Sequence, residues 1–150
     1  MSAAATLTWL VRYGHVAAGA LWLGGYLVLA FVLVPALAKG GGAGVLERLT
    51  LTTVRVLTYT GTATIFFGLL LVPRTRGYDD LLGGEWGGLI VSCVVIAVAL
   101  LGLGDSALRP ALRRLKETGD VKAAQRFALL GFALSLLAVG LMTRALYAPT

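Results

Sequence analysis

Charged side chains are scarce in this sequence: they make up 13% of its 150 residues, whereas apolar residues make up 58%. A soluble domain of this length needs a polar surface to cover its core, and so few charges cannot supply one. The composition therefore excludes an ordinary soluble domain and indicates an integral membrane protein, since long apolar runs are typical of membrane spans.

The residues that carry most enzyme and metal chemistry are also few, because cysteine and histidine occur once each, as Cys93 and His15. A single cysteine excludes an internal disulfide and a zinc site made of several cysteines. The sequence has no phosphate-binding loop, and the apolar runs hold no nucleophile paired with a base and no pair of carboxylates. We therefore assign no catalytic residue.

Acidic residues are outnumbered: 7 Asp and Glu stand against 13 Lys and Arg, for a formal net charge of +6. Six of the 13 basic residues gather in segment 109–126, between two apolar runs. Basic loops next to spans are the ordinary topology signal of membrane proteins. The charge thus indicates an orientation in a membrane, and we expect a lipid bilayer rather than a nucleic acid as the partner.

Four apolar runs are present, and each is long enough, at about 1.5 Å per residue, to cross a bilayer core of about 30 Å. They cover about residues 9–34, 49–72, 86–108 and 127–147. The first three are soon followed by Pro35, Pro73 and Pro110; since proline has no N–H to continue a helix, we expect the spans to end there. Because short connections make neighbouring helices antiparallel, the sequence predicts a single all-α domain, residues 1–150, built as a four-helix antiparallel up-down bundle.

The first and third loops of this bundle hold most of the basic residues and share one side of it. The positive-inside rule places that side in the cytoplasm. We therefore expect both chain termini to lie on the outer side of the membrane.

Five ionisable side chains lie within the expected spans, where each costs roughly 2.5–3.5 kcal/mol to insert and usually faces the bundle interior. They are Arg12, His15, Arg55, Asp105 and Arg144. Arg55 and Asp105 have similar depths near the cytoplasmic ends of their spans, so we predict an ion pair between them. Arg55, Tyr59 and Thr62 follow one another at helical spacing, which predicts that they form a buried polar face with Asp105.

His15 lies about two helical turns below the outer surface of the first span. The outer part of the third span holds Cys93 and that of the fourth holds Met142, so the three residues fall in one outer layer. Imidazole, thiolate and thioether groups together form a soft ligand set that suits Cu(I). We therefore consider a copper site made of His15, Cys93 and Met142, although depth alone does not fix which face of each helix points inward.

Haem is an alternative ligand for His15, since histidine is a common axial ligand of haem iron. Gly19, one turn beyond His15, would leave room for a flat porphyrin. Arg12 and Arg144 lie near the outer ends of their spans, where they either extend to the membrane surface or hold an anion such as a haem propionate. A third interpretation of His15 is an interior histidine whose hydrogen bonds are satisfied within the protein.

The segment RYGHVAAGALWLGGYLVLAFVLVPAL resembles the opening helix of the copper-resistance protein D family. That family has a histidine early in the helix and then a tryptophan-glycine segment, matched here by His15, Trp22, Gly24 and Gly25. The resemblance implies a four-helix domain of the bacterial inner membrane that moves or handles copper.

Two further segments carry the same resemblance. LTYTGTATIFFGLLLVP, with Thr60 and Gly61, is similar to the family's second helix. GEWGGLIVSCVVIAVALLGLGDSALRPALRRL, with Trp86 and Gly87, is similar to the aromatic-glycine start of its next helix. The resemblance therefore extends over most of the chain.

The wider group of such bundles resembles membrane b-type cytochromes and small membrane proteins that oxidise protoporphyrinogen. Relatives often carry a lysine in the third helix, where this chain has Cys93, and that departure disfavours the oxidase activity. The hypothesis that follows is copper handling. Its alternatives are electron transfer with haem b, and a structural role in a homo-oligomer or larger membrane complex.

Overall fold

The computed structural model describes residues 2–40 and 43–149, and these are almost entirely helical. The elements are α1 (Ala3–Val28), η1 (Leu29–Leu33), α2 (Val34–Ala38), α3 (Ala43–Thr75), η2 (Asp79–Leu82), α4 (Gly84–Gly102), η3 (Leu103–Leu108), α5 (Arg109–Thr118) and α6 (Lys122–Ala145). Elements η1 and η3 are π-helical turns, and η2 is a 3₁₀ turn. No strand occurs in the described residues, so the prediction of an all-α fold is confirmed.

Four continuous helices are long and apolar enough to cross a membrane. They are Ala3–Ala38, Gly44–Thr75, Gly84–Thr118 and Lys122–Ala145. Each expected span falls largely within one of them, but the expectation that helices stop at the prolines is wrong. Pro35 and Pro110 lie in the first turn of the helix that follows a π-helical turn, and Pro73 lies inside α3 near its end.

A change of hydrogen bonding in η1 explains how the first helix passes its proline. The N–H of Val34 donates to the carbonyl of Leu29 instead of that of Ala30. The next residue, Pro35, has no N–H to donate. The carbonyl of Ala30 therefore loses its helical donor, and the side-chain amide of Gln125 on α6 donates to it at 2.8 Å.

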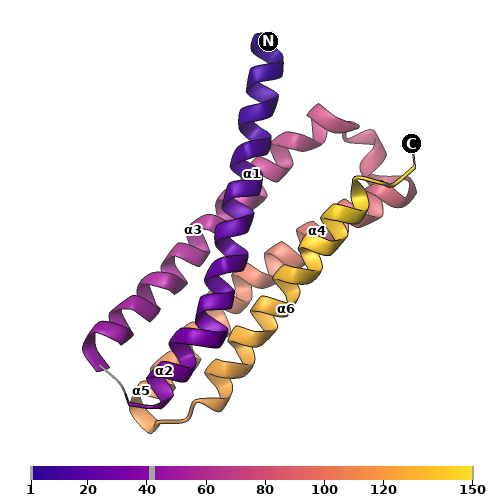
Figure 1. The fold of residues 1–150 in the computed structure, drawn as a ribbon. Helices are drawn as coiled ribbons and strands as arrows, with labels where there is room; N and C mark the ends of the chain where they lie inside the picture. The colour runs from indigo at the N-terminus through magenta and orange to yellow at the C-terminus, as the bar shows by residue number, and fades with distance from the viewer. Residues whose placement is uncertain (1, 41–42, 150) are drawn as a thin grey trace.

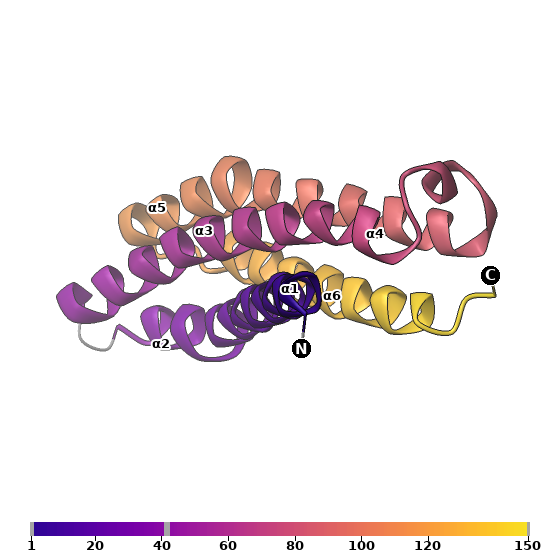
Figure 2. The ribbon, with the colours of Figure 1, turned by 90° about the horizontal axis from the view of Figure 1, so that it is seen from above.

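The helices lie side by side in two layers. Helix α1 packs along α3 and, less extensively, along α6, while α4 packs along α6. Figure 2 shows α1 and α6 in one layer and α3 with α4 in the other. Both termini and the α3–α4 connection lie at one end of the molecule, here named the terminal end, and the α2–α3 and α5–α6 connections lie at the opposite, connection end (Figure 1).

Glycines allow the large side chains of α1 to sit close against the other helices. A Cβ atom at Gly61 would lie 2.7 Å from the ring of Trp22, and one at Gly131 would overlap the ring of Tyr26. Tyr26 is 1% exposed, and its hydroxyl donates to the carbonyl of Leu100 on α4 at 3.0 Å. Since close packing holds apolar helices together in a membrane, these contacts join α1 to α3, α4 and α6.

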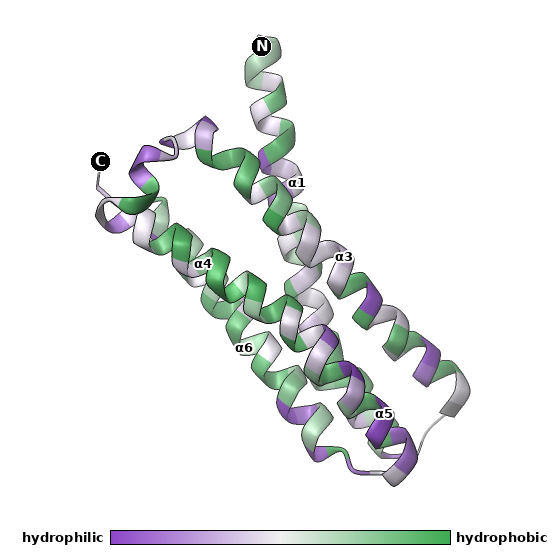
Figure 3. Ribbon diagram, turned by 180° about the vertical axis from the view of Figure 1, so that it is seen from behind, coloured by the Kyte–Doolittle hydropathy of each residue, from purple (hydrophilic) through white to green (hydrophobic). Residues whose placement is uncertain are grey.

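Large apolar side chains cover the outside of the long helices. Leu21, Phe66, Val95 and Leu136, one from each, are between 53% and 62% exposed. Figure 3 shows apolar residues along the lengths of the helices and polar residues toward both ends, on α5 at the connection end and in the α3–α4 connection at the terminal end. Apolar surface of this extent is typical of a protein that contacts lipid or other proteins.

The contact between Gly131 and Tyr26 gives a stability prediction. Gly131→Ala places a methyl group where the Tyr26 ring lies, and such overpacking typically costs about 1–3 kcal/mol. We expect a lower melting temperature for this variant, measured by circular dichroism in detergent. Gly140→Ala on the same helix is the control, since nothing lies within 4 Å of its added Cβ, and it should melt at or above the wild-type temperature. Equal melting of the two variants would contradict the packing described for Tyr26.

Candidate ligand site at His15

The imidazole of His15 lies between α1 and α3. Its Nδ1 is 2.8 Å from the carbonyl oxygen of Thr64, and its ring lies against Gly68, where an added Cβ would be 3.0 Å from Cε1. A carbonyl oxygen only accepts hydrogen bonds, so Nδ1 must carry the proton. In the neutral ring Nε2 is then left with a free lone pair.

The second ring nitrogen of His15, Nε2, belongs to a half-buried side chain. Nε2 has no hydrogen-bond partner in residues 2–40 and 43–149, and the one buried side-chain polar atom without a partner there is Oε1 of Gln125. Metal-binding histidines commonly donate their second ring N–H to a backbone carbonyl, which fixes the tautomer and the ring orientation. The bond from His15 Nδ1–H to Thr64 is of this kind, and it leaves Nε2 without a partner among the described residues.

The space expected beside Gly19 is bounded by α3. A Cβ at Gly19 would meet the methyl group of Thr64 at 3.7 Å, and one at Gly14 would meet the ring of Phe67 at 2.9 Å. Both glycines thus allow α3 to approach α1. The neighbouring helix lies where the sequence suggested room for a porphyrin.

The other two expected copper ligands lie on other helices, Cys93 on α4 and Met142 on α6. The thiol of Cys93 is buried on α4 and donates to the carbonyl of Ala138 on α6 at 3.7 Å. Met142 lies one turn beyond Ala138 on α6 and is half-buried. Among the described residues, no group of three His, Cys, Asp or Glu side chains could hold a metal ion. The structure thus shows a histidine on one helix pair, and a thiol and a thioether on another.

The two outer arginines have different surroundings. Arg144 forms an ion pair with Glu85 at 2.5 Å, with both side chains partly exposed, so a carboxylate of the chain itself occupies the position expected for an anion. Arg12 is exposed on α1 and lines a shallow hollow formed by the first turns of that helix. Neither residue lies in a shared recess with His15 in the part of the chain that is described.

The predicted buried polar face is wrong. Arg55, Tyr59, Thr62 and Asp105 are all exposed on the chain, and Tyr59 is 68% exposed. Asp105 pairs with Arg109 at 3.1 Å instead of with Arg55. The physical reason is local: Arg109 stands four residues after Asp105, where the helix itself brings the two side chains together.

The buried face of α3 carries small and apolar residues instead. His15 and Trp22 are seven residues apart on α1, and the glycines that they contact, Gly68 and Gly61, are also seven apart on α3. The shared spacing of about two helical turns was present in the sequence as a signal for this interface. The backbone acceptor at Thr64 left no such signal, since any residue type supplies a carbonyl.

Comparison with known proteins gives no match to this chain among family models, curated proteins or solved structures. The resemblance to the copper-resistance protein D family therefore stays a prediction from the motifs quoted above. The geometry of His15 is the remaining physical basis for a functional site.

The tautomer of His15 can be measured directly, because it is the single histidine of the chain. In detergent, at a pH where the ring is neutral, nitrogen NMR of protein labelled with ¹⁵N-histidine should show a protonated Nδ1 and an unprotonated Nε2. This follows from the carbonyl of Thr64, which can only accept. A spectrum dominated by the opposite tautomer would sink the assignment of Nε2 as a free ligand.

Proposed function

We propose that the chain is a multi-pass protein of the bacterial inner membrane whose four helices cross the bilayer in alternating directions. The exposed apolar side chains support this, because they would lie against lipid acyl chains. The order of contacts between α1 and α3 gives further support. His15 contacts Gly68, whereas Gly25, further along α1, contacts Leu57, which comes earlier in α3. This reversed order is expected of antiparallel neighbours.

The orientation proposed for this protein places the connection end in the cytoplasm and both termini outside. Basic residues at the connection end support it: Lys39, Arg48, Arg109, Arg113, Arg114, Lys116, Lys122 and Arg126. Lys and Arg near span ends are the residues that favour the cytoplasmic side.

Reporter fusions test this orientation. An enzyme that is active only outside the cytoplasm should be active when fused after residue 149 and inactive when inserted at Gly119, in the α5–α6 connection. Each fusion is the control for the other, and their reporter activities are compared at equal levels of expression. The reverse pattern would show that the proposed orientation is inverted.

Within this membrane protein we propose that His15 binds copper, as a step in handling or moving the metal. The observation that carries the proposal is the hydrogen bond from Nδ1–H to Thr64. This bond holds the ring and leaves the lone pair of Nε2 free to bind a metal ion. Imidazole is a ligand that copper accepts. The resemblance of the first helix to the copper-resistance family points to the same metal.

His15 acts in this proposal without Cys93 and Met142 in its coordination sphere, since Cys93 on α4 packs against α6 and Met142 lies on α6, whereas His15 lies between α1 and α3. Additional copper ligands would come from a second copy of the chain or from a larger membrane complex. The outer part of α1 leaves room for such a partner, because Trp9, Tyr13 and Val16 are each more than half exposed.

Copper binding by the purified protein tests the proposal. His15→Asn keeps an amide N–H that can donate to Thr64 and removes the imidazole lone pair. We expect this variant to bind Cu(I) at least tenfold more weakly, since even the loss of a supporting residue around a metal site costs about 10–100-fold. Competition with a chromophoric Cu(I) chelator in detergent measures the affinity, and circular dichroism checks that the fold is intact.

Cys93→Ala and Met142→Leu are matched controls and should retain wild-type copper affinity. Unchanged copper binding in His15→Asn would overturn the role proposed for the histidine. A Soret band in the wild-type spectrum that is lost in His15→Asn would replace copper by haem b. If the wild type binds neither, the remaining function is that of a structural subunit.

A further inference from the structure

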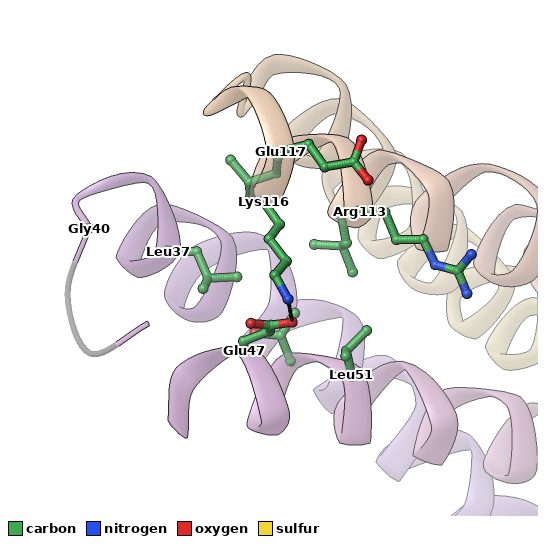
Figure 4. Close-up of a pocket in the computed structure, with 10 residues that line it drawn as sticks. Leu37, Gly40, Glu47, Leu51, Arg113, Lys116 and Glu117 are labelled. Carbon is green, nitrogen blue, oxygen red and sulfur yellow. Dashed lines mark hydrogen bonds and ion pairs between the residues drawn. The ribbon is translucent and has the colours of Figure 1, made fainter. Parts of the chain in front are cut away.

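A cleft of about 540 Å³ opens at the connection end, between α2, the start of α3 and α5. Its apolar walls include Leu37, Leu51, Leu112 and Leu115. Figure 4 shows Leu37 on α2 and Leu51 on α3 facing the space below α5. The cleft therefore offers apolar surface from three separate elements at the same end of the molecule.

Charged side chains form the rim of this cleft. Lys116 reaches across it to Glu47, with Nζ and Oε1 2.9 Å apart (Figure 4). Arg113 extends along α5 away from this pair and is exposed. Glu117 stands one turn further on α5, but no ion pair or hydrogen bond to Arg113 forms in the described residues. Lys116 is thus neutralised within the chain, and Arg113 keeps its full set of donors.

The surroundings of the cleft are strongly basic. Basic residues at this end outnumber the acidic ones, which are Glu47, Asp105, Glu117 and Asp120. Arg55 lies on α3 one turn beyond Leu51, exposed, on the side toward the membrane interior. Three arginines lie on α3 and α5 near the cleft. Arg109 is paired with Asp105, whereas Arg55 and Arg113 have no ion-pair partner in the described part of the chain.

We infer that this cleft binds an anionic phospholipid, with its headgroup phosphate on Arg113 and an acyl chain along Leu51 and Leu112. The planar guanidinium binds phosphate through two parallel hydrogen bonds, which a lone arginine at an apolar cleft can supply. Basic recesses between helices at the cytoplasmic surface are places where anionic headgroups gather. The apolar walls favour a lipid over free phosphate, since a bare anion gains nothing from leucine side chains. This inference rests on the membrane location proposed above.

Lipid binding by the full chain in detergent tests the inference. Fluorescent phosphatidylglycerol should bind the wild type more tightly than fluorescent phosphatidylcholine. Arg113→Gln should weaken phosphatidylglycerol binding roughly fivefold, the contribution of one basic residue near an anionic lipid surface. Arg114→Gln is the control: the residue is exposed next to Arg113 on α5 and carries the same charge, but it does not line the cleft.

Three results would overturn the inference. They are equal affinity for the two lipids, equal losses in Arg113→Gln and Arg114→Gln, and displacement of the bound lipid by millimolar inorganic phosphate. The last result would identify a free phosphate site instead of a lipid site. Copper affinity of the same Arg113→Gln protein and its recovery in the membrane fraction separate this test from the proposed function, since neither depends on the cleft.

Discussion

Side chains of α1 that sit against glycines of its neighbours are the contacts on which the rest of the fold depends. Trp22 lies against Gly61 on α3, and Tyr26 lies against Gly131 on α6. A larger residue at either glycine would separate the helices by the width of a methyl group or more. In the bilayer proposed for this chain no hydrophobic effect would compensate for lost contact between helices, so these small residues would set the distance between them.

The same helix spacing positions the one histidine. Because Gly68 follows Gly61 by seven residues, as Trp22 follows His15, the imidazole lies in the same groove of α3 as the indole. The close approach brings Nδ1 within hydrogen-bond distance of a backbone carbonyl that a bulkier interface would keep away. The packing of the two helices therefore determines which ring nitrogen of His15 is left without a partner.

The sequence predicted the positions of the helices well, but it predicted poorly which face of each helix is buried. Apolar runs predicted the positions of the four long helices, because length and hydropathy are local properties. Which face of a helix is buried depends on the neighbour that it meets. Threonines do not indicate that face, because Thr62 donates to the carbonyl of Thr58 in its own helix and needs no buried partner. Asp105 likewise found its partner locally, in Arg109. His15 was recognised as the residue to examine, but its acceptor was a carbonyl, which composition cannot reveal.

The bond from Gln125 to Ala30 has a consequence for synthesis of the protein. Its two residues are 95 positions apart, in the first and last of the long helices. Ribosomes add about 5–20 residues per second, so the carbonyl of Ala30 waits roughly 5–20 seconds for its donor after the first helix has been made. Until Gln125 has been made, the carbonyl of Ala30 lacks the side-chain donor that it has in the folded chain.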